Sequence, residues 1–432
     1  MTAVQALYAE RVTTAAGAVR RITSGMRVYL TGNCSVPQTL LSALVQRAPE
    51  LRDVEIVQVL TVGPADYVAP EMAGHLRVNT LFISDNVRAA VNEGRADFTP
   101  VFLSEVPRLF KSGLLATDVA LVHVSPPDEH GFCSFGIEVG MTKPIAQSAK
   151  VVIAEMNPRM PRTLGDSFIH LSKLDLVVPV DYPLPEIRMG DTSETIQRIA
   201  DHVAGLIPDG ATLQTGIGAI PDAVLSRLGS HKDLGIHTEL FSDGIIDLIA
   251  RGVITGERKT LHPGKVIAGF VLGTQRLYDF IHDNPVIELH PQDYVNDPFV
   301  IAQNVRMVAI NSAIEVDLTG QVCADSIGPR LYSGVGGQLD FIYGASRSQG
   351  GVPVIALPST ALGGRASRIV GTLKPGSGVT TSRNHIRYVA TEHGVADLYG
   401  KTVRERARAL IAIADPRFRD DLERSARDLR YL

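Results

Sequence analysis

Tryptophan is absent from this sequence, and cysteine is rare, with only Cys34, Cys133 and Cys323. The cysteines are widely spaced and form no Cys-x-x-Cys motif. This excludes a zinc ribbon or a disulfide framework and favours a reducing compartment such as the cytoplasm. No apolar run approaches the roughly 18 residues that a membrane span needs. The first residues lack the apolar core of a secretory signal. We therefore expect a cytoplasmic protein without membrane contact.

The sequence also lacks a large excess of acidic or basic residues, since its formal net charge is −4. No basic cluster with interleaved aromatic residues occurs, which argues against a nucleic-acid partner. The hydrophobic share of 45% and the charged share of 20% are typical of a globular protein. A chain of 432 residues is too long for one core, so we expect two domains.

Motifs of several enzyme classes are absent as well. There is no Gly-x-Ser-x-Gly elbow and no His-Glu-x-x-His helix. The segment from Gly394 to Thr402 resembles a phosphate-binding loop, but five residues separate its glycines where four are needed. The twelve histidines show no metal-ligand spacing, so no metal site is expected.

A glycine turn is the first positive signal. Residues 211–215 are β-prone, Gly216, Ile217, Gly218 and Ala219 form a tight turn, and Pro221 suits the first position of a helix. Backbone N–H groups at such a turn and the positive helix end can hold an anion. The third glycine of a dinucleotide fingerprint is missing, so nicotinamide and flavin binding are disfavoured.

A second strand, residues 234–241, follows this helix. Ile236, Thr238 and Leu240 alternate with His237, Glu239 and Phe241, which places Glu239 near the carboxyl end of the strand. Ligands bind outside the carboxyl ends of strands in open α/β sheets. A lone glutamate there is more often a solvated rim residue, so the local pattern alone leaves a catalytic role open.

The first half of the chain carries a similar pattern. Residues 1–20 read as one amphipathic helix, residues 119–124 as a buried parallel strand, and residues 125–136 as a long polar turn. Prolines near residues 180–190 predict a linker. Gly32 pairs with Gly216 and Pro37 with Pro221, each 184 positions apart, which suggests two related α/β halves. When the alignment of the two halves is continued along the chain, Val59 takes the position of Glu239.

The second half also holds a glycine cluster. A strand at residues 308–311 ends in Asn311, and Gly334, Gly336 and Gly337 follow. Such glycines allow close approach of the backbone to a ligand or a nest of N–H donors. A hairpin or tight turn explains them equally well.

Six segments together resemble the acetyl-CoA hydrolase/transferase family, that is, class I CoA-transferases of the 4-hydroxybutyrate CoA-transferase type. They span nearly the whole chain: VSPPDEHG at 124–131, GIGAIP at 216–221, HTE at 237–239, AINSA with VDLTGQ at 309–321, GVGGQ at 334–338 and TEHGVADL at 391–398. The resemblance implies two similar open α/β domains with mostly parallel sheets, residues 1–187 and 188–432, with the active site between them.

The family mechanism implies roles for particular residues. The Glu239 carboxylate would attack the thioester of an acyl-CoA and pass through acyl-glutamyl anhydride and glutamyl-CoA thioester intermediates, with ping-pong kinetics. A free glutamate has a pKa of about 4.3, so we expect Glu239 to be ionised without a general base. Glu392 matches an acidic position near the site. The oxyanion and CoA contacts implied are Gln214, Gly216, Ile217, Gly218, Ala219, Ile220, Asn311, Gly334, Gly336 and Gly337.

The resemblance leaves alternatives open. A CoA-transferase would move CoA from acetyl-CoA or butyryl-CoA to a short acid such as 4-hydroxybutyrate, and coenzyme A would be a substrate, with no permanently bound cofactor. An acyl-CoA hydrolase on the same scaffold would also use Glu239, and a non-enzymatic CoA-binding scaffold is a third possibility. The acid is not specified by the motifs. A homodimer is implied by resemblance only.

Overall fold

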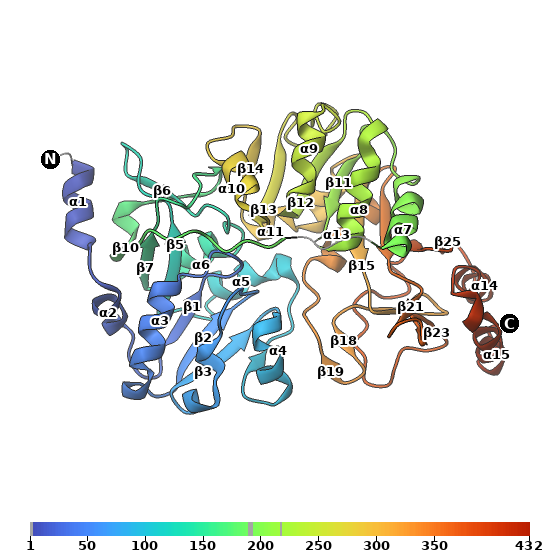
Figure 1. The fold of residues 1–432 in the computed structure, drawn as a ribbon, viewed down its shortest axis with the longest axis horizontal. Coiled ribbons are helices and arrows are strands. Elements are labelled where there is room, and N and C mark those ends of the chain that lie inside the picture. The colour runs from blue at the N-terminus through green and yellow to red at the C-terminus, as the bar shows by residue number, and fades with distance from the viewer. Residues whose placement is uncertain (1–2, 189–192, 217) are drawn as a thin grey trace. The chain divides into compact units, whose positions relative to one another are not determined.

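The computed structural model describes residues 3–188, 193–216 and 218–432 (Figure 1). The chain forms two compact units. The first combines Met1–Arg188 with Ile267–Val295, and the second combines Met189–Val266 with Asn296–Leu432. The expected boundary between residues 187 and 188 places residues 267–295 in the C-terminal domain, whereas in the structure this segment belongs to the first unit. The assignment of two domains to residues 1–187 and 188–432 stays a proposal.

The first unit is built on a seven-stranded sheet whose strand pairs are all parallel. Every residue of β5 is buried, as its continuous apolar sequence predicts. In sheet order the strands are β10 (Leu176–Pro179), β7 (Val151–Met156), β5 (Val119–Val124), β1 (Arg27–Leu30), β2 (Val54–Gln58), β3 (Leu76–Thr80) and β4 (Asp97–Phe98).

Helices and short strands complete the first unit (Figure 1). The helices are α1 (Ala3–Arg11), α2 (Ala15–Ala18), α3 (Gln38–Arg47), α4 (Asp85–Asn92), α5 (Val106–Lys111), α6 (Thr142–Ser148), α10 (Gln275–Ile281) and α11 (Gln292–Val295). The further strands are β6 (Phe132–Ser134), β8 (Leu164–Gly165), β9 (Phe168–His170), β13 (Val266–Val271) and β14 (Ile287–Leu289).

In the second unit, β11 lies between β15 and β12 in a mostly parallel sheet. Only β24 and β25 form an antiparallel pair among these strands, because a hairpin at Glu392 and His393 joins them. In sheet order they are β25 (Gly394–Asp397), β24 (Tyr388–Thr391), β20 (Val352–Ala356), β15 (Met307–Ser312), β11 (Thr212–Thr215) and β12 (Gly235–Phe241).

Some helices of the second unit begin at a residue whose side chain accepts a backbone hydrogen bond, namely Ser193, Asp297 and Thr402. Thr402 and Glu405 form a capping box at α14. The helices are α7 (Glu194–Ala204), α8 (Ala219–Arg227), α9 (Gly244–Ala250), α12 (Pro298–Ala302), α13 (Gln338–Arg347), α14 (Val403–Ala412) and α15 (Arg419–Asp428). The short strands are β16 (Glu315–Asp317), β17 (Val322–Cys323), β18 (Ser326–Ile327), β19 (Arg330–Leu331), β21 (Thr360–Ala361), β22 (Ala366–Ser367) and β23 (Ile369–Val370).

The strand orders confirm that the two halves are related. The order β10-β7-β5-β1-β2 in the first unit matches β24-β20-β15-β11-β12 in the second, strand for strand in chain sequence. If Gly32 is aligned with Gly216, the registers of both strand pairs place Leu60, not Val59, at the position of Glu239. The predicted equivalence was therefore wrong by one residue, because the loops before the second strands differ in length.

Three local expectations also need correction. Residues 1–20 do not form one helix, since Thr14 accepts a hydrogen bond from the Gly17 N–H and starts a separate helix. The helix after the first glycine turn begins at Ala219, two residues before Pro221. The polar turn at 125–136 contains the strand β6. Among the described residues, no helix is long and apolar enough to cross a membrane.

A buried carboxylate ties β7 to the start of α3. Glu155 is fully buried, and its Oε1 accepts the Leu40 N–H at 2.6 Å, while Tyr182 donates its hydroxyl to the other oxygen. Burial raises the pKa of Glu155 to about 7, against the effect of these hydrogen bonds. The folded protein therefore binds a proton that the unfolded chain has released by this pH.

We expect Glu155→Gln to stabilise the protein at about pH 8 relative to about pH 5. A carboxyl whose folded pKa is raised favours the folded state at low pH, and that contribution is lost as the pH rises towards 7. A tenfold difference in proton affinity between the folded and unfolded states corresponds to about 1.4 kcal/mol of stability. Thermal midpoints at the two pH values measure the effect. Equal wild-type and variant pH dependences would show that Glu155 does not titrate in this range.

Candidate active site

Glu239 lies on β12, two residues before the carboxyl end of the strand. It is the only partly exposed residue of this strand, whose other six residues are buried. β12 runs parallel to β11, and the Thr238 hydroxyl donates to the Thr215 carbonyl oxygen at 3.1 Å. The carboxylate therefore projects from a rigid strand at the edge of the sheet where α/β proteins bind ligands, as predicted.

Two residues far along the chain enclose this carboxylate. Asn296 donates from Nδ2 to the Glu239 Oε2 atom at 2.9 Å. The Gly337 backbone comes so close that a Cβ atom built on it would lie 1.9 Å from the same oxygen. Gly337 is also the N-cap residue of α13, whose positive end favours a negative charge at this place. Any side chain at position 337 would force the Glu239 and Asn296 side chains to shift.

The pKa of Glu239 differs from that of a free glutamate. Burial raises the pKa of the Glu239 carboxyl above its usual value, and the hydrogen bond from Asn296 lowers it in part. The assumption of an ordinary glutamate pKa was therefore wrong. A more basic carboxylate is a stronger nucleophile once ionised, and its attack should slow as the pH falls through the raised pKa.

The first glycine turn lies at the same sheet edge. Gly218 has a φ of 117° and caps α8, so a side chain there would be strained. Gly216 and Ala219 are partly exposed and Ile220 is buried. Ile217 lies outside the described residues. The open space around Gly216 and Gly218 suits an incoming ligand atom, and the oxyanion role of this turn stays a prediction.

Gln214 and Asn311 form a pair on neighbouring strands. Asn311 donates from Nδ2 to Gln214 Oε1 at 3.0 Å. Gln214 is fully buried, whereas Asn311 is partly exposed at the end of β15. Of the two expected CoA contacts, Asn311 is accessible, and Gln214 lies underneath and fixes its amide.

Of the second glycine cluster, formed by Gly334, Gly336 and Gly337, one residue contacts the Glu239 carboxylate. Gly337 contacts Glu239, while Gly336, with a φ of 58°, forms the turn before it, and Gly334 is buried earlier in the loop. Glu392 accepts hydrogen bonds from the backbone N–H and the hydroxyl of Ser359, at 2.8 and 2.6 Å. These contacts place Glu392 at the loop after β20, and none of them joins it to Glu239.

Sequence reasoning missed Asn296 and Asp340. Asn296 is fully buried and its Nδ2 also lies 3.3 Å from Asp340 Oδ2. Asp340 is in the first turn of α13 and is 4% exposed. Neither residue stands in a motif with a known spacing to Glu239. The only signal was the short separation of Gly337 and Asp340 along the chain.

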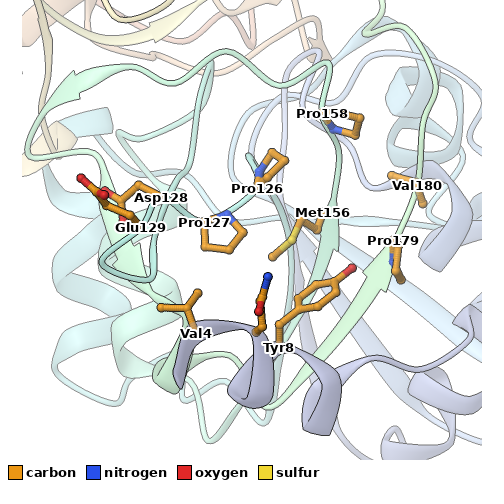
Figure 2. Close-up of a pocket in the computed structure, with 11 residues that line it drawn as sticks. Val4, Tyr8, Pro126, Pro127, Asp128, Glu129, Met156, Pro158, Pro179 and Val180 are labelled. Atoms are coloured by element: carbon orange, nitrogen blue, oxygen red, sulfur yellow. The ribbon is translucent and has the colours of Figure 1, made fainter. Parts of the chain in front are cut away.

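The VSPPDEHG segment has a structural role in the first unit. Asp128 accepts the His130 and Phe132 N–H groups and forms an ion pair with Arg162 at 2.7 Å. This turn and α1 border an apolar hollow of about 560 Å³, into which Tyr8 and Met156 point (Figure 2). No lining residue of this hollow belongs to the second unit.

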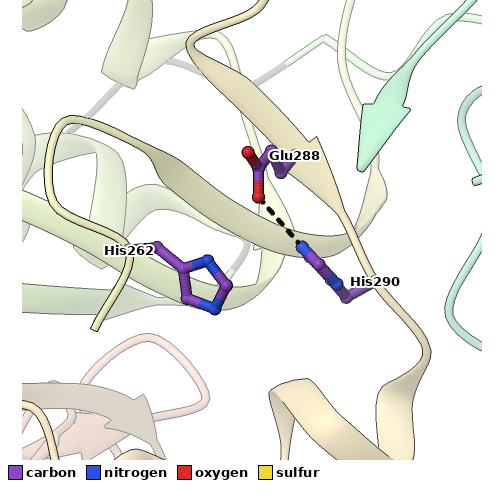
Figure 3. Close-up of side chains that lie close together, drawn as sticks. All are labelled: His262, Glu288 and His290. Atoms are coloured by element: carbon purple, nitrogen blue, oxygen red, sulfur yellow. Dashed lines mark hydrogen bonds and ion pairs between the residues drawn. The ribbon is translucent and has the colours of Figure 1, made fainter. Parts of the chain in front are cut away.

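Glu288 and His290 form a second polar feature of the first unit (Figure 3). The two residues lie two positions apart at β14, so their side chains leave the same face, and Glu288 Oε2 is 3.2 Å from His290 Nε2. The spacing is that of an ion pair formed when the histidine is protonated.

Known protein families and relatives match this chain over nearly its full length. The model of the acetyl-CoA hydrolase/transferase N-terminal domain matches residues 2–185, and that of the C-terminal domain matches residues 273–426. Glu239 lies between the two matched segments. The 4-hydroxybutyrate coenzyme A transferase of Clostridium kluyveri is 52% identical over 416 residues, which cover 96% of this chain and 97% of the relative.

Solved structures agree with the sequence relatives. RipA from Yersinia pestis superposes with a TM-score of 0.93 at 35% identity and covers 100% of both chains. The 4-hydroxybutyrate CoA-transferase of Porphyromonas gingivalis gives a TM-score of 0.86 at 43% identity, over 98% of this chain and 99% of that one. These similarities confirm an α/β protein with two large, mostly parallel sheets.

We expect Gly337→Ala to slow the CoA transfer that the resemblance implies by roughly 100-fold, because its Cβ would displace the Glu239 carboxylate. A displacement of about 1 Å at a reacting group can cost roughly 100-fold in rate. Gly205→Ala is the matched control, since its Cβ would approach no atom closer than 3.5 Å. Acyl-CoA turnover and thermal midpoints of both variants are the measurements. A Gly337→Ala variant as active as the wild type would contradict this geometry.

Proposed function

The chain belongs to the acetyl-CoA hydrolase/transferase family and is a CoA-transferase, and from this premise we propose that Glu239 is its nucleophile. The enzyme moves CoA from a small acyl-CoA, such as acetyl-CoA or butyryl-CoA, to a short carboxylic acid such as 4-hydroxybutyrate. The observation that carries the proposal is the Glu239 carboxylate held between Asn296 and Gly337 at the carboxyl edge of the sheet.

The first half-reaction converts the carboxylate into a thioester. A Glu239 oxygen attacks the thioester carbonyl carbon of the donor, the C–S bond breaks, and CoA leaves as a thiolate. The product is an acyl-glutamyl anhydride. The thiolate then attacks the glutamyl Cδ atom, and the donor acid departs with one oxygen that came from Glu239. The enzyme is left as a glutamyl-CoA thioester.

The second half-reaction runs these steps in reverse. The acceptor carboxylate attacks Cδ and expels the thiolate, which forms a new anhydride. The thiolate then attacks the acyl carbonyl of that anhydride, the new acyl-CoA leaves, and the Glu239 carboxylate is restored with one oxygen from the acceptor. No proton needs to be removed from an ionised nucleophile, so these steps require no general base.

Each attack creates an oxyanion that needs hydrogen-bond donors. The close approach of Gly337 supports its N–H group as one donor, and the turn around Gly216 and Gly218 supplies the other. Removing one donor of this kind typically costs about 100- to 1,000-fold in kcat. Backbone donors act without the loss of side-chain conformational freedom, which favours them as oxyanion donors.

We propose that a hollow in the second unit binds the CoA moiety of the substrate. It has a volume of about 500 Å³ and begins at Ser312, directly after Asn311. Its lining is mostly apolar and includes Tyr332 and Leu362. Arg368 and Lys374 carry positive charge there, and Lys374 forms an ion pair with the lining residue Glu315 at 3.1 Å. An apolar wall with cations suits the pantetheine arm and the phosphates of CoA.

We further propose that the protein is a homodimer and works in the cytoplasm. The dimer rests on the resemblance alone, and light scattering of the purified protein measures it. The three cysteines are buried and unpaired, which supports a reducing compartment. The active site between the two halves also stays a proposal.

The function is tested by incubating the enzyme with acetyl-CoA or butyryl-CoA and a panel of short carboxylates. We expect new acyl-CoA, most with 4-hydroxybutyrate, and little free CoA. Free CoA that appears at the same rate whichever acid is present would identify a hydrolase instead. No product with any acid would contradict the proposed substrates.

The nucleophile is tested with Glu239→Gln, an isosteric amide that lacks the anionic oxygen. We expect CoA transfer to fall by at least about 10,000-fold, as for other nucleophile substitutions. Binding of CoA, measured by calorimetry, should change little. A variant with near-normal turnover would remove Glu239 from the mechanism.

A further inference from the structure

One amide nitrogen serves two carboxylates at the active site. Asn296 Nδ2 is 2.9 Å from Glu239 Oε2 and 3.3 Å from Asp340 Oδ2. All three side chains belong to the second unit, and both Asn296 and Asp340 are buried. An amide nitrogen carries two hydrogens, and an ionised carboxylate only accepts, so one N–H is available for each partner.

The second carboxylate determines how the amide is oriented. Rotation of the Asn296 amide by half a turn would place its oxygen against the Glu239 and Asp340 oxygens, which repel it. With Glu239 alone as a neighbour, this preference depends on the charge of the nucleophile itself. Asp340 supplies an acceptor that does not change during the reaction.

Under the proposed function, the nucleophile loses its charge when the first anhydride forms and regains it only at the end of the catalytic cycle. In the anhydride and in the glutamyl-CoA thioester, Glu239 is a neutral acyl group and a weaker hydrogen-bond acceptor than a carboxylate. The amide must nevertheless keep its N–H directed at this group, because it stabilises the carboxylate that re-forms. Asp340 remains available as an acceptor throughout.

The position of Asp340 is fixed by the start of α13. Gln338, one residue after Gly337, donates from Nε2 to the Ser312 carbonyl oxygen at 2.6 Å and accepts from the Thr381 hydroxyl at 3.1 Å. The same helical turn therefore brings Gly337 against Glu239 and Asp340 against Asn296. A carboxylate in the first turn of a helix is itself favoured by the helix dipole.

We propose that Asp340 is a positioning residue that keeps the Asn296 amide directed at Glu239 through both half-reactions. The inference rests on the proposed role of Glu239 and extends it, because it assigns a function to a residue that touches no substrate. Asp340 acts through its acceptor oxygen and not through its charge.

Two substitutions separate these effects. Asp340→Asn removes the charge but keeps an acceptor oxygen, whereas Asp340→Leu removes both and keeps the branching of the side chain. We expect Asp340→Asn to retain kcat within a few-fold and Asp340→Leu to lose up to about 100-fold. KM for the acyl-CoA should change little in either variant. Asp317→Asn, a buried carboxylate that only binds its own turn, is the matched control.

The pH profile provides a readout that a merely structural role would not move. The Asn296 hydrogen bond lowers the pKa of Glu239, so its loss in Asp340→Leu should shift the acid limb of kcat/KM to higher pH. Loss of the negative charge alone would shift that limb to lower pH. Asn296→Ala should shift it upward as well, and the double variant with Asp340→Leu should be no slower than Asn296→Ala.

Equal losses in Asp340→Asn and Asp340→Leu, or a downward shift of the limb in both, would overturn the proposal in favour of a charge effect. Additive losses in the double variant would overturn it too. If Asp340→Leu does not fold, Asp340→Ala carries the same expectations. Failure of the proposed function is recognised separately, because the wild type would then form no covalent CoA adduct.

Discussion

The contact between the Gly337 backbone and the Glu239 carboxylate is the constraint on which the active site depends. The carboxylate occupies the space that any side chain at position 337 would fill. This contact brings the carboxylate to the positive end of α13, and burial raises the pKa of the carboxyl. Burial makes the group more basic, while the helix end and Asn296 keep the anion attainable. Burial thus makes the carboxylate more nucleophilic, while Asn296 and the helix end stabilise its ionised form.

The strand order explains why these groups meet. In the second unit, β12 carries Glu239, and the loop before α13 returns to the same edge of the sheet after β15. The first unit repeats the strand order but has Leu60 at the position of Glu239. A duplicated scaffold thus carries the nucleophile in one copy only. The buried Glu155 of the first unit fastens a helix instead.

Much of the fold followed from the sequence, because strands and turns leave short-range signals. The apolar run of β5, the glycine turn after β11 and the alternation along β12 each predicted an element that the structure contains. Boundaries were less certain. Thr14 divides the N-terminal helix through a side-chain hydrogen bond, and the helix after the glycine turn begins two residues before Pro221.

The site was predictable only in part, for a physical reason. Glu239 lies near the end of a predicted strand and Gly337 lies in a glycine-rich loop. The local sequence therefore indicated the backbone conformation at both positions. Asn296 and Asp340 did not, because their roles arise from tertiary contacts over 57 and 44 residues of chain. The raised pKa of Glu239 likewise depends on burial that no local pattern encodes.

The most direct test of the account uses an acceptor acid labelled with oxygen-18 in its carboxylate. After turnover with unlabelled acyl-CoA in ordinary water, the peptide containing Glu239 is isolated and its mass is measured. The account predicts that label from the acid appears in the Glu239 side chain, because the acceptor oxygen becomes part of the restored carboxylate. Turnover without label in this peptide would contradict a covalent role for Glu239.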